Sequence, residues 1–438
     1  MNTVSIKESP AMTVPIENWL TICEMLGETS TALAQVCRRT RAPAYEFMFK
    51  AVVFKDIGDL VEAANAWSDV GGRVLALVKE LNLGVQIERR QDGVALHCNG
   101  RYEAHLNEIA FIHIRSMRHL TRLNITGIAI GSKIFSAITG LQQLCVLSLE
   151  NVCVVGILEK YELDVMVARH VRLVNTCWHT LNLEEGLIRG SKNLKTLEMS
   201  WRGGGNKPRT GSENWQNATC ESLEIHSRRG AWSTTRENLQ NERREFMALI
   251  RRFKAIKKLH IRGWLPKFND ADAGHQTLSD SIAYFVGPVH FMKLSRRLPN
   301  LGRITLSDNG LNRGEVNEVE MQVQKVTILE VNVYVDDKER MCMMLAVMAN
   351  VHQLKLNFSD DVNEPDDILN SVRDMLDYSP PIKRLFITAD DPFVTEIPQE
   401  HFRALKAVCP GLEDIRIGQR CWRTKQGLWI EYIERDTN

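Results

Sequence analysis

A six-residue pattern, apolar-x-x-apolar-x-apolar, recurs eleven times between Leu120 and Ile417. The copies begin at Leu120, Leu144, Trp178, Leu194, Cys220, Ile256, Leu301, Val326, Val351, Ile382 and Leu412. The alternation at the end of each copy has the period of two that sends alternate side chains to one face of a β-strand. Recurrence along most of a chain predicts a repeat array with a long binding surface rather than a catalytic pocket.

The pattern is similar to the strand of a leucine-rich repeat, whose units follow one another about every 20–29 residues. Here the spacing is uneven, from 16 residues between Leu181 and Leu197 to 45 between Leu259 and Ile304. One further copy, at 78–83, precedes the others. The uneven spacing is typical of divergent repeats.

Helical periodicity separates the strand patterns. Apolar residues recur at i, i+3, i+4 and i+7 within 134–141, 246–253, 341–348 and 368–376. Each such helix has one apolar face to bury. The alternation predicts a parallel sheet on the inside of an arc with helices outside. The methionines of 341–344 are therefore predicted to fill the core rather than to bind a metal or cofactor.

Three short helices are expected ahead of the repeats. Pro15 opens the first, where its missing N–H costs nothing, and Gly27 ends it. The second is expected to close at Arg38 and Arg39, and Pro43 to open the third. Three helices in so short a segment cannot enclose a dry core. Their leftover apolar faces need either a partner or the neighbouring repeats.

This segment resembles an F-box motif, whose pattern begins with Leu-Pro-x-Glu and continues through spaced leucines to Val-Cys-Arg. The matching positions are Pro15, Glu17, Leu20, Ile22, Leu26, Leu33, Val36, Cys37 and Arg38. The sequence departs from the pattern at Val14, where the family has leucine, and near Thr40, where it often has tryptophan. An F-box directly before leucine-rich repeats is a known arrangement in this family.

The resemblance implies a non-catalytic substrate receptor of a cullin-RING ubiquitin ligase. The helices would dock a Skp-type adaptor and, through it, a cullin, while the repeats hold an unknown protein substrate close to the conjugating enzyme. The implied adaptor-binding residues are Pro15, Ile16, Leu20, Ile22, Leu26, Leu33, Val36 and Cys37. The alternative is a leucine-rich-repeat scaffold or regulator whose N-terminal helices only cap the array, with no ligase role.

The expected fold is α/β, with a three-helix F-box followed by a leucine-rich-repeat solenoid of parallel inner sheet and outer helices. Residues 1–12 are expected to form a flexible tail, 13–56 the F-box-like helices, 57–420 the solenoid and 421–438 a C-terminal cap. The cap is aromatic-rich, with Trp422, Trp429 and Tyr432 available to close the open end of the core. Two insertions, 210–219 and 267–299, interrupt the repeats, and the second is expected to hold a helical stretch broken at Gly287.

On the concave face, five residues of neighbouring repeats form a predicted basic stripe for substrate binding: His226, Lys258, His260, Arg262 and Arg303. An anionic partner, such as a phosphorylated segment, suits arginine because its guanidinium binds phosphate through two donors. An ordinary solvated sheet face remains the alternative. Trp201, Trp232 and Trp264 either anchor a partner or cover the edge of the core.

Composition favours no other functional class. A net charge of +1 gives no overall attraction to nucleic acid or membrane. The sequence has no run of 18 apolar residues and its start lacks the apolar core of a secretory signal. Ten scattered cysteines are typical of a reducing compartment, so cytoplasm or nucleus is expected. The loop at 203–208 lacks the ending of a phosphate-binding loop, and we expect no enzyme activity, cofactor or metal.

Overall fold

The computed structural model describes fifteen segments of the chain. These are 16–26, 38–68, 73–84, 104–155, 167–178, 187–188, 191–201, 216–227, 232–266, 279–288, 298–307, 325–333, 338–358, 365–389 and 397–432. The chain divides into two compact units, each described separately below. Unit 1 is Met1–Ser200 with Gly211–Asn217, and unit 2 is Trp201–Thr210 with Ala218–Asn438.

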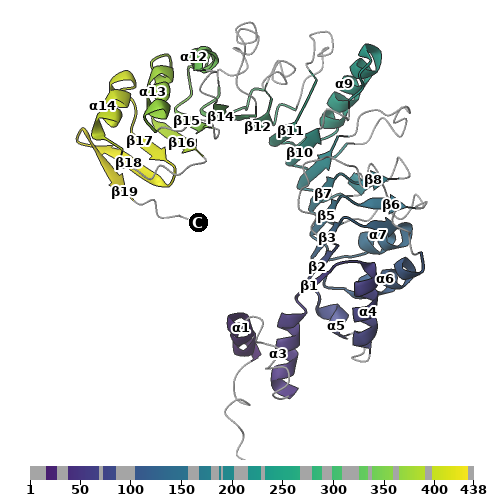
Figure 1. Cartoon of the computed structure of the whole chain (residues 1–438). Coiled ribbons are helices and arrows are strands. Elements are labelled where there is room, and N and C mark those ends of the chain that lie inside the picture. The colour runs from purple at the N-terminus through teal and green to yellow at the C-terminus, as the bar shows by residue number, and fades with distance from the viewer. Residues whose placement is uncertain are drawn as a thin grey trace, which may run out of the picture. The chain divides into compact units, whose positions relative to one another are not determined.

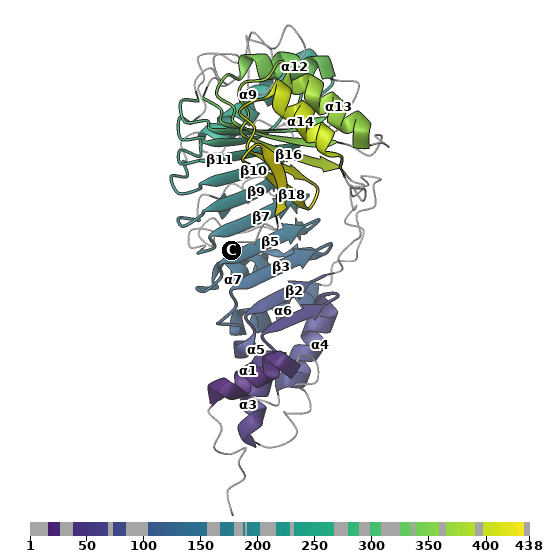
Figure 2. The same cartoon turned by 90° about the vertical axis from the view of Figure 1, so that its left-hand side faces the viewer.

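Unit 1 is built on a parallel sheet that follows chain order (Figure 1). Its strands are β1 (Ala51–Phe54), β2 (Glu80–Leu83), β3 (Arg122–Thr126), β5 (Val146–Glu150), β7 (His170–Val174) and β9 (Thr196–Ser200). A second, small parallel sheet holds β4 (Ala129–Gly131), β6 (Cys153–Val155) and β8 (Cys177–Trp178). Figure 2 looks onto the stacked strands β2, β3, β5 and β7.

The helices of unit 1 lie mainly on one side of that sheet. They are α4 (Ile57–Ser68), α5 (Arg73–Leu77), α6 (Ala104–Ser116) and α7 (Ser132–Thr139). Two more, α1 (Ile16–Leu26) and α3 (Arg38–Met48), precede the first strand (Figure 1). The helix side carries the core, because Leu60 and Val61 of α4 and Phe135 and Ile138 of α7 are all buried.

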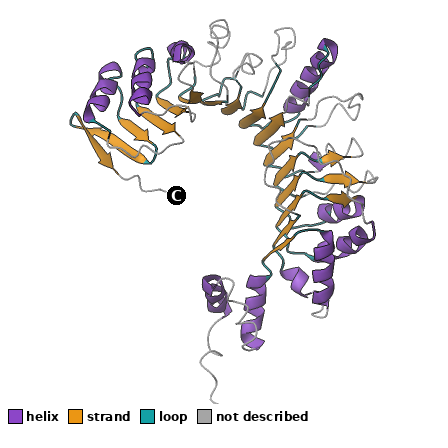
Figure 3. Cartoon of the chain, in the orientation of Figure 1, coloured by secondary structure: helices purple, strands orange, loops and turns teal. Residues whose placement is uncertain are grey.

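Unit 2 repeats the plan and closes with a hairpin (Figure 3). Its parallel strands are β10 (Ser222–Ser227), β11 (Lys258–Gly263), β12 (Tyr284–Gly287), β13 (Arg303–Leu306), β14 (Ile328–Val333), β15 (Gln353–Phe358), β16 (Arg384–Ala389) and β17 (Asp414–Ile417). The antiparallel strands β18 (Arg420–Lys425) and β19 (Leu428–Tyr432) follow. Behind the sheet lie α9 (Arg236–Arg251), α12 (Lys338–Val347), α13 (Pro365–Leu376) and α14 (Gln399–Val408).

A recurring backbone contact aligns neighbouring strands in both units. The carbonyl one residue before a strand accepts hydrogen bonds from two successive N–H groups of the next strand, which its two lone pairs allow. The Thr121 carbonyl, for example, accepts from Cys145 and Val146 at 2.8 and 3.0 Å. The Lys257 carbonyl does the same for Ala283 and Tyr284. This contact places the buried leucines of successive strands side by side.

The strand pattern alternates between a buried and an accessible face, as predicted. In β15 the side chains of Leu354 and Leu356 are fully buried, whereas Gln353, Lys355 and Asn357 remain partly accessible. We call the accessible side the open face; it is the side of each unit's sheet that faces away from helices α4–α7 or α9–α14. The predicted parallel sheet with helices on one side is thus confirmed within each unit.

Two strands were missed because their patterns are incomplete. The strand β7 follows Ala168 rather than a large apolar residue, and β12 ends in Gly287 where the pattern has an apolar side chain. Their central residues, Val171 and Phe285, pair in register with Leu147 and Leu259. The helical stretch expected in the second insertion is therefore wrong for residues 284–287, which are a strand. Because β12 lies between β11 and β13, the long spacing from Leu259 to Ile304 is divided into two shorter ones at Phe285.

The copy beginning at Trp178 is not a strand of the main sheet in its described part. Trp178 ends the two-residue strand β8 of the small sheet, and residues 179–186 lie outside the described residues. In the main sheet β5 pairs with β7, and β7 pairs with β9. The earlier copy at 78–83, by contrast, is confirmed by the pairing of β2 with β3.

The N-terminal helices begin and end differently from the prediction. The first ends at Leu26, as expected from Gly27. Arg38, expected to close the second helix, instead opens α3, and Pro43 lies inside that helix rather than at its start. Residues 27–37, which include the expected second helix, lie outside the described residues, as does the expected tail at 1–12. The segment 51–54, which we had grouped with the F-box-like residues 13–56, is the strand β1.

The predicted helices and cap are otherwise present. Periodicity correctly predicted α7, α9, α12 and α13, and Met341 and Met344 are buried in the core. In the C-terminal hairpin, Trp422 and Trp429 pack on Phe402 of α14, with ring centroids 5.0 and 5.8 Å apart. The hairpin therefore covers the last exposed part of the core of unit 2. No described helix combines the length and apolar character needed to cross a membrane.

Left-handed backbone positions turn the chain away from the sheet after several strands of unit 1. Gly84, Gly127, Asn151 and Asn175 follow β2, β3, β5 and β7, and all have positive φ. At Gly84, with φ of 108°, an added Cβ would lie 1.8 Å from the carbonyl oxygen of Thr126. Only glycine therefore allows β2 and β3 to approach each other at this turn.

We expect Gly84→Ala to lower the free energy of unfolding by more than about 1–2 kcal/mol, the cost of a left-handed conformation, because the backbone clash adds to it. Urea unfolding monitored by circular dichroism measures this. The matched control is Gly140→Ala, because Gly140 has φ of −78° and an added Cβ would meet only ordinary contacts at 3.5 Å. Equal effects of the two substitutions would contradict this account.

Candidate interaction surfaces

The helices α1 and α3 share a small core of their own. Cys23 of α1 and Ala44 of α3 are fully buried, with Tyr45, Phe47 and Met48 packed partly buried against them. Burial raises the pKa of the Cys23 thiol, so it stays protonated at neutral pH and behaves as a small apolar side chain. So small a core leaves much of both helices uncovered.

The structure places part of the predicted adaptor-binding set on α1. Ile16, Leu20, Ile22 and Leu26 all belong to this helix, and among them only the side chain of Ile22 is described; it is half-buried. The other predicted residues, Pro15, Leu33, Val36 and Cys37, lie outside the described residues. Met25, which we had not singled out, is 82% exposed on the same helix.

Contacts near residues 46–50 connect α3 to the first repeat. The Lys50 carbonyl accepts hydrogen bonds from the N–H groups of Lys79 and Glu80, both at 2.9 Å. Lys79 Nζ also pairs with Glu46 Oε1 at 3.2 Å, and both side chains are more than a third exposed, so this ion pair adds little stability. The backbone contact is the same two-donor arrangement that joins the repeats.

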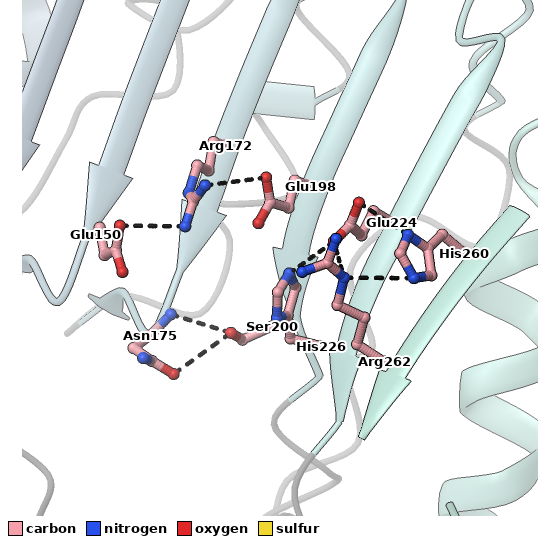
Figure 4. Close-up of polar contacts among 9 residues, drawn as sticks. All are labelled: Glu150, Arg172, Asn175, Glu198, Ser200, Glu224, His226, His260 and Arg262. Atoms are coloured by element: carbon pink, nitrogen blue, oxygen red, sulfur yellow. Dashed lines mark hydrogen bonds and ion pairs between the residues drawn. The ribbon is translucent and has the colours of Figure 1, made fainter. Parts of the chain in front are cut away.

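On the open face of unit 1, one arginine lies between two glutamates. Arg172 NH2 lies 3.2 Å from Glu150 Oε2, and its NH1 lies 3.4 Å from Glu198 Oε2 (Figure 4). Beside it, amide side chains form hydrogen bonds between strands. Asn124 donates to Asn82 at 2.6 Å, and Asn175 donates to Asn151 at 3.0 Å. This part of the face is polar and carries an excess of carboxylate.

On the open face of unit 2, Glu224 collects three of the predicted basic residues. Its carboxylate oxygens lie 3.2 Å from His226 Nε2, 3.1 Å from His260 Nδ1 and 2.7 Å from Arg262 Nε (Figure 4). Partial burial alone would raise the pKa of Glu224. Hydrogen bonds from both histidines, with the charges of His260 and Arg262, lower that pKa far below the ordinary carboxyl range. Glu224 therefore stays ionised and neutralises part of the predicted stripe.

The other two stripe residues lie on either side of an aromatic ring. Lys258 Nζ is 5.2 Å and Arg303 Cζ is 4.6 Å from the ring centroid of Tyr284 on β12. Both distances suit a cation–π interaction. The Tyr284 hydroxyl also lies 3.1 Å from Thr305 Oγ1. Tyr284 was absent from the predicted surface because β12 itself was missed.

Glu330 on β14 is a second carboxylate surrounded by donors. Lys355 Nζ lies 2.7 Å from Oε1, and Arg303 NH2 and Thr305 Oγ1 both lie 3.3 Å from Oε2. Partial burial would raise the pKa of Glu330, but the hydrogen bond and charge of Lys355, with further hydrogen bonds from Asn357 and Arg303, lower it. Glu330, on β14, thus holds side chains from the strands on either side of it, β13 and β15.

A third carboxylate, Asp414, lies between two arginines near the C-terminal hairpin. Its Oδ1 is 2.6 Å from Arg423 Nε, and its Oδ2 is 3.6 Å from Arg384 Nε. Both arginines are well exposed. Nothing in the sequence pattern pointed to this group, because β16, β17 and β18 bring its members together only in the folded sheet.

The structure therefore divides the predicted basic stripe into two groups. His226, His260 and Arg262 surround Glu224, whereas Lys258 and Arg303 flank Tyr284. All five lie on the open face, but β12 was not predicted, and the carboxylates Glu224 and Glu330 were not among the predicted substrate-binding residues. Glu224 appeared in the expected strand register, yet its role as a counter-ion depends on a residue 36 positions away.

Two of the three singled-out tryptophans belong to the core. Trp201 and Trp232 are buried and contact each other and Phe246 of α9, with ring centroids 5.1–5.6 Å apart. Trp232 Nε1 donates to Ser227 Oγ at 2.8 Å. These two rings cover the core behind β10, which was one of the two interpretations offered. Trp264 is exposed just after β11.

Comparisons with solved structures give likenesses in fold. An internalin (inlF) from Listeria monocytogenes has 12% identity and a TM-score of 0.30, covering 69% of this chain and 82% of that one. The TLR13–ssRNA13 complex has 10% identity and a TM-score of 0.35, covering 70% of this chain and 54% of that one. The LRR ectodomain of the Arabidopsis thaliana receptor kinase GASSHO1/SCHENGEN3 has 11% identity and a TM-score of 0.22, covering 69% of this chain and 36% of that one.

The chain thus spans about half of the second of these structures and about a third of the third. No family model matches the chain, and no curated protein matches it. Within each unit, the parallel register, the buried leucine pattern and the helices on one side define an α/β repeat array of the leucine-rich-repeat type. The ligands in the names of those structures are ligands of those proteins, and we do not assign them to this chain.

We expect Glu330→Gln to lower the free energy of unfolding at pH 7 by about 1–3 kcal/mol, because Glu330 is only 13% exposed and accepts charge-assisted hydrogen bonds. Its folded-state pKa is lowered, so its contribution is present above the ordinary carboxyl pKa and is lost as the pH falls below it. The difference between wild type and variant should therefore shrink between pH 7 and about pH 3.

Urea unfolding at both pH values measures this difference. Glu413→Gln is the matched control, because Glu413 is exposed one residue before β17. It should change stability little at either pH. A wild-type advantage over Glu330→Gln that persists undiminished at low pH would refute the assigned role of the carboxylate.

Proposed function

We propose that this chain is a substrate receptor of a cullin-RING ubiquitin ligase. The N-terminal helices would dock a Skp-type adaptor, and the open face of the repeats would hold the protein to be ubiquitinated. The chain would act by proximity, raising the effective concentration of a substrate lysine near the conjugating enzyme. It would need no catalytic residues, and we expect it to work in the cytoplasm or nucleus.

The observation that carries this proposal is the way α1 and α3 pack. They share a small core with each other, while α4 and α5 already cover the sheet behind β1 and β2 with Leu60, Val61, Val74 and Leu75. A helix pair that is not needed to bury the first repeat suits a docking module. The F-box resemblance of residues 14–38 supports the same interpretation.

Exposure on α1 adds to this support. Met25 is largely exposed and Ile22 only half-buried, so the helix presents apolar side chains to its surroundings. Burying such side chains against a partner is favourable by roughly 1.5–3 kcal/mol each. The resemblance assigns that partner as the Skp-type adaptor.

The alternative function is a leucine-rich-repeat scaffold or regulator, in which these helices act as an N-terminal cap. The contacts of Lys50 and Glu46 with Lys79 favour it, because they continue the joining pattern of the repeats into α3. A cap of this kind would require no adaptor. The two functions therefore differ in whether the isolated chain binds an adaptor.

We expect Leu20→Ala combined with Ile22→Ala to weaken adaptor binding by at least about 100-fold, because two buried side chains are lost at the proposed interface. Co-purification of the full chain with a Skp-type adaptor and a cullin measures this. The matched control, Val53→Ala with Ile112→Ala, truncates two exposed apolar residues on β1 and α6 and should leave binding unchanged.

Circular dichroism of each variant should show an intact repeat array. Deleting residues 1–48 should abolish adaptor capture while retaining β1 and Lys50, which the first repeat uses. Undiminished capture by the double variant or by the deletion would refute the docking role of α1 and α3. Failure of the intact chain to bind any adaptor would favour the scaffold function.

A further inference from the structure

The strand register of unit 2 aligns one residue from each of nine strands into a single row on the open face. Each member is the Cα partner of the next across the sheet. We call these residues the cation row: Lys258, Tyr284, Arg303, Ile328, Gln353, Arg384, Asp414, Arg423 and Ile430. None of them is buried.

The cation row carries an excess of positive charge. It holds four cations, Lys258, Arg303, Arg384 and Arg423, and one acid, Asp414. In the neighbouring row Glu330 pairs with both Arg303 and Lys355, and the charge of Lys355 offsets that of Glu330, so the excess remains. The chain as a whole has a net charge of only +1, so this concentration is local.

The arginines of the row are held in place and still accessible. The side chains of Arg303, Arg384 and Arg423 are 45, 58 and 60% exposed. Tyr284 supports the Arg303 guanidinium through its ring face, while one carboxylate, Asp414, is shared by Arg384 and Arg423. A guanidinium carries five donors, so two of them around one carboxylate keep donors for a further anion.

Uncharged side chains separate the cations. Tyr284, Ile328 and Gln353 lie between Lys258 and Arg384, and Ile430, which is exposed, ends the row beyond Arg423. Strands lie about 4.8 Å apart, so cations two strands apart are separated by about 10 Å. In an extended segment, carboxylates three residues apart span about the same distance.

We propose that the cation row binds an acidic segment of a partner protein, in which carboxylate side chains recur at every third position with apolar ones among the others. The segment would be extended in the polyproline II manner, in which residues three apart share one face. This inference rests on the proposed function, because the segment would belong to the substrate. The carboxylates would pair with Arg303, Arg384 and Arg423, and apolar side chains would pack on Tyr284, Ile328 and Ile430. Charge complementarity is what selects this class of partner.

The length of the cation row determines how long a test peptide must be. Seven strand spacings separate Lys258 on β11 from Arg423 on β18, or about 34 Å, which an extended peptide of about 10–12 residues spans. The probe is a fluorescein-labelled 12-residue peptide of repeated Glu-Leu-Glu. A Lys-Leu-Lys peptide of equal length is its control. Fluorescence anisotropy with the full chain measures binding.

We expect the acidic probe to bind and the basic one not to bind. Arg303→Ala with Arg384→Ala should weaken binding by about 10–100-fold, because charge-assisted hydrogen bonds to two carboxylates are lost. Binding should also fall as salt is raised. The matched control Arg244→Ala with Arg403→Ala removes two exposed arginines from α9 and α14 and should bind as the wild type does.

A second variant keeps the test valid if the arginine substitutions disturb folding. Gln353→Glu adds a negative charge between Ile328 and Arg384 without removing any partner of Arg384 or Arg423, and it should also weaken the acidic probe at least about tenfold. Binding that is unchanged in Gln353→Glu would overturn the proposal. Equal loss in the control variant would do the same.

A single-stranded RNA of matched charge separates general anion binding from peptide recognition. RNA binding as tight as that of the peptide, with the same loss in Gln353→Glu, would overturn the assignment to an acidic protein segment. Adaptor capture is measured on the same preparations. Capture without peptide binding refutes only the cation row, whereas peptide binding without capture refutes only the ligase role.

Discussion

One backbone carbonyl per strand, accepting two N–H groups from the next, determines how the repeats of each unit align. At Thr121, Lys257 and the equivalent positions this contact puts each strand in register with its neighbour. The register then brings Leu123 beside Leu147 and Leu329 beside Leu354, so the same alignment buries the core. A single repeat makes neither the hydrogen bonds nor the core, because both need a neighbouring strand.

The same register decides the electrostatics of the open face. In unit 1 an arginine lies between two glutamates, whereas in unit 2 each of three carboxylates lies among several cations. In two of these groups the carboxylate is the less accessible member, since Glu330 is far more covered than Arg303 and Asp414 far more than Arg384 and Arg423. Acids near the sheet therefore fix the positions of cations that reach outward. The Arg172 cluster of unit 1 therefore has more carboxylates than cations, whereas the Asp414 cluster of unit 2 has more cations than carboxylates.

The repeat architecture could be predicted from sequence where the pattern is complete. The strands beginning at Arg122, Ser222 and Gln353 follow directly from it, as do the helices with one apolar stripe. The strands β7 and β12 could not be predicted, because Ala168 and Gly287 occupy pattern positions and only pairing with neighbours makes these segments strands. Trp178, which begins another copy of the pattern, lies in the small sheet.

The candidate surface was less predictable than the fold for a related reason. Sequence register correctly predicted that His260 and Arg303 face the same side, but not that Glu224 and Glu330 would hold them. Those contacts join residues 27 to 36 positions apart, and no local pattern reports which charges meet across strands. Asp414 meets Arg384 through the register of β16 with β17, and it meets Arg423 only because the C-terminal hairpin folds back beside β17.

Alternation of buried and accessible side chains, as in β15, separates two kinds of selective pressure on this chain. In β15 a change at Leu354 or Leu356 disturbs packing, whereas a change at Gln353 or Lys355 alters only what the surface offers to solvent. Such a chain can drift in recognition, one strand at a time, while its scaffold stays constant. Homologues should therefore diverge fastest at the accessible positions and keep their buried leucines.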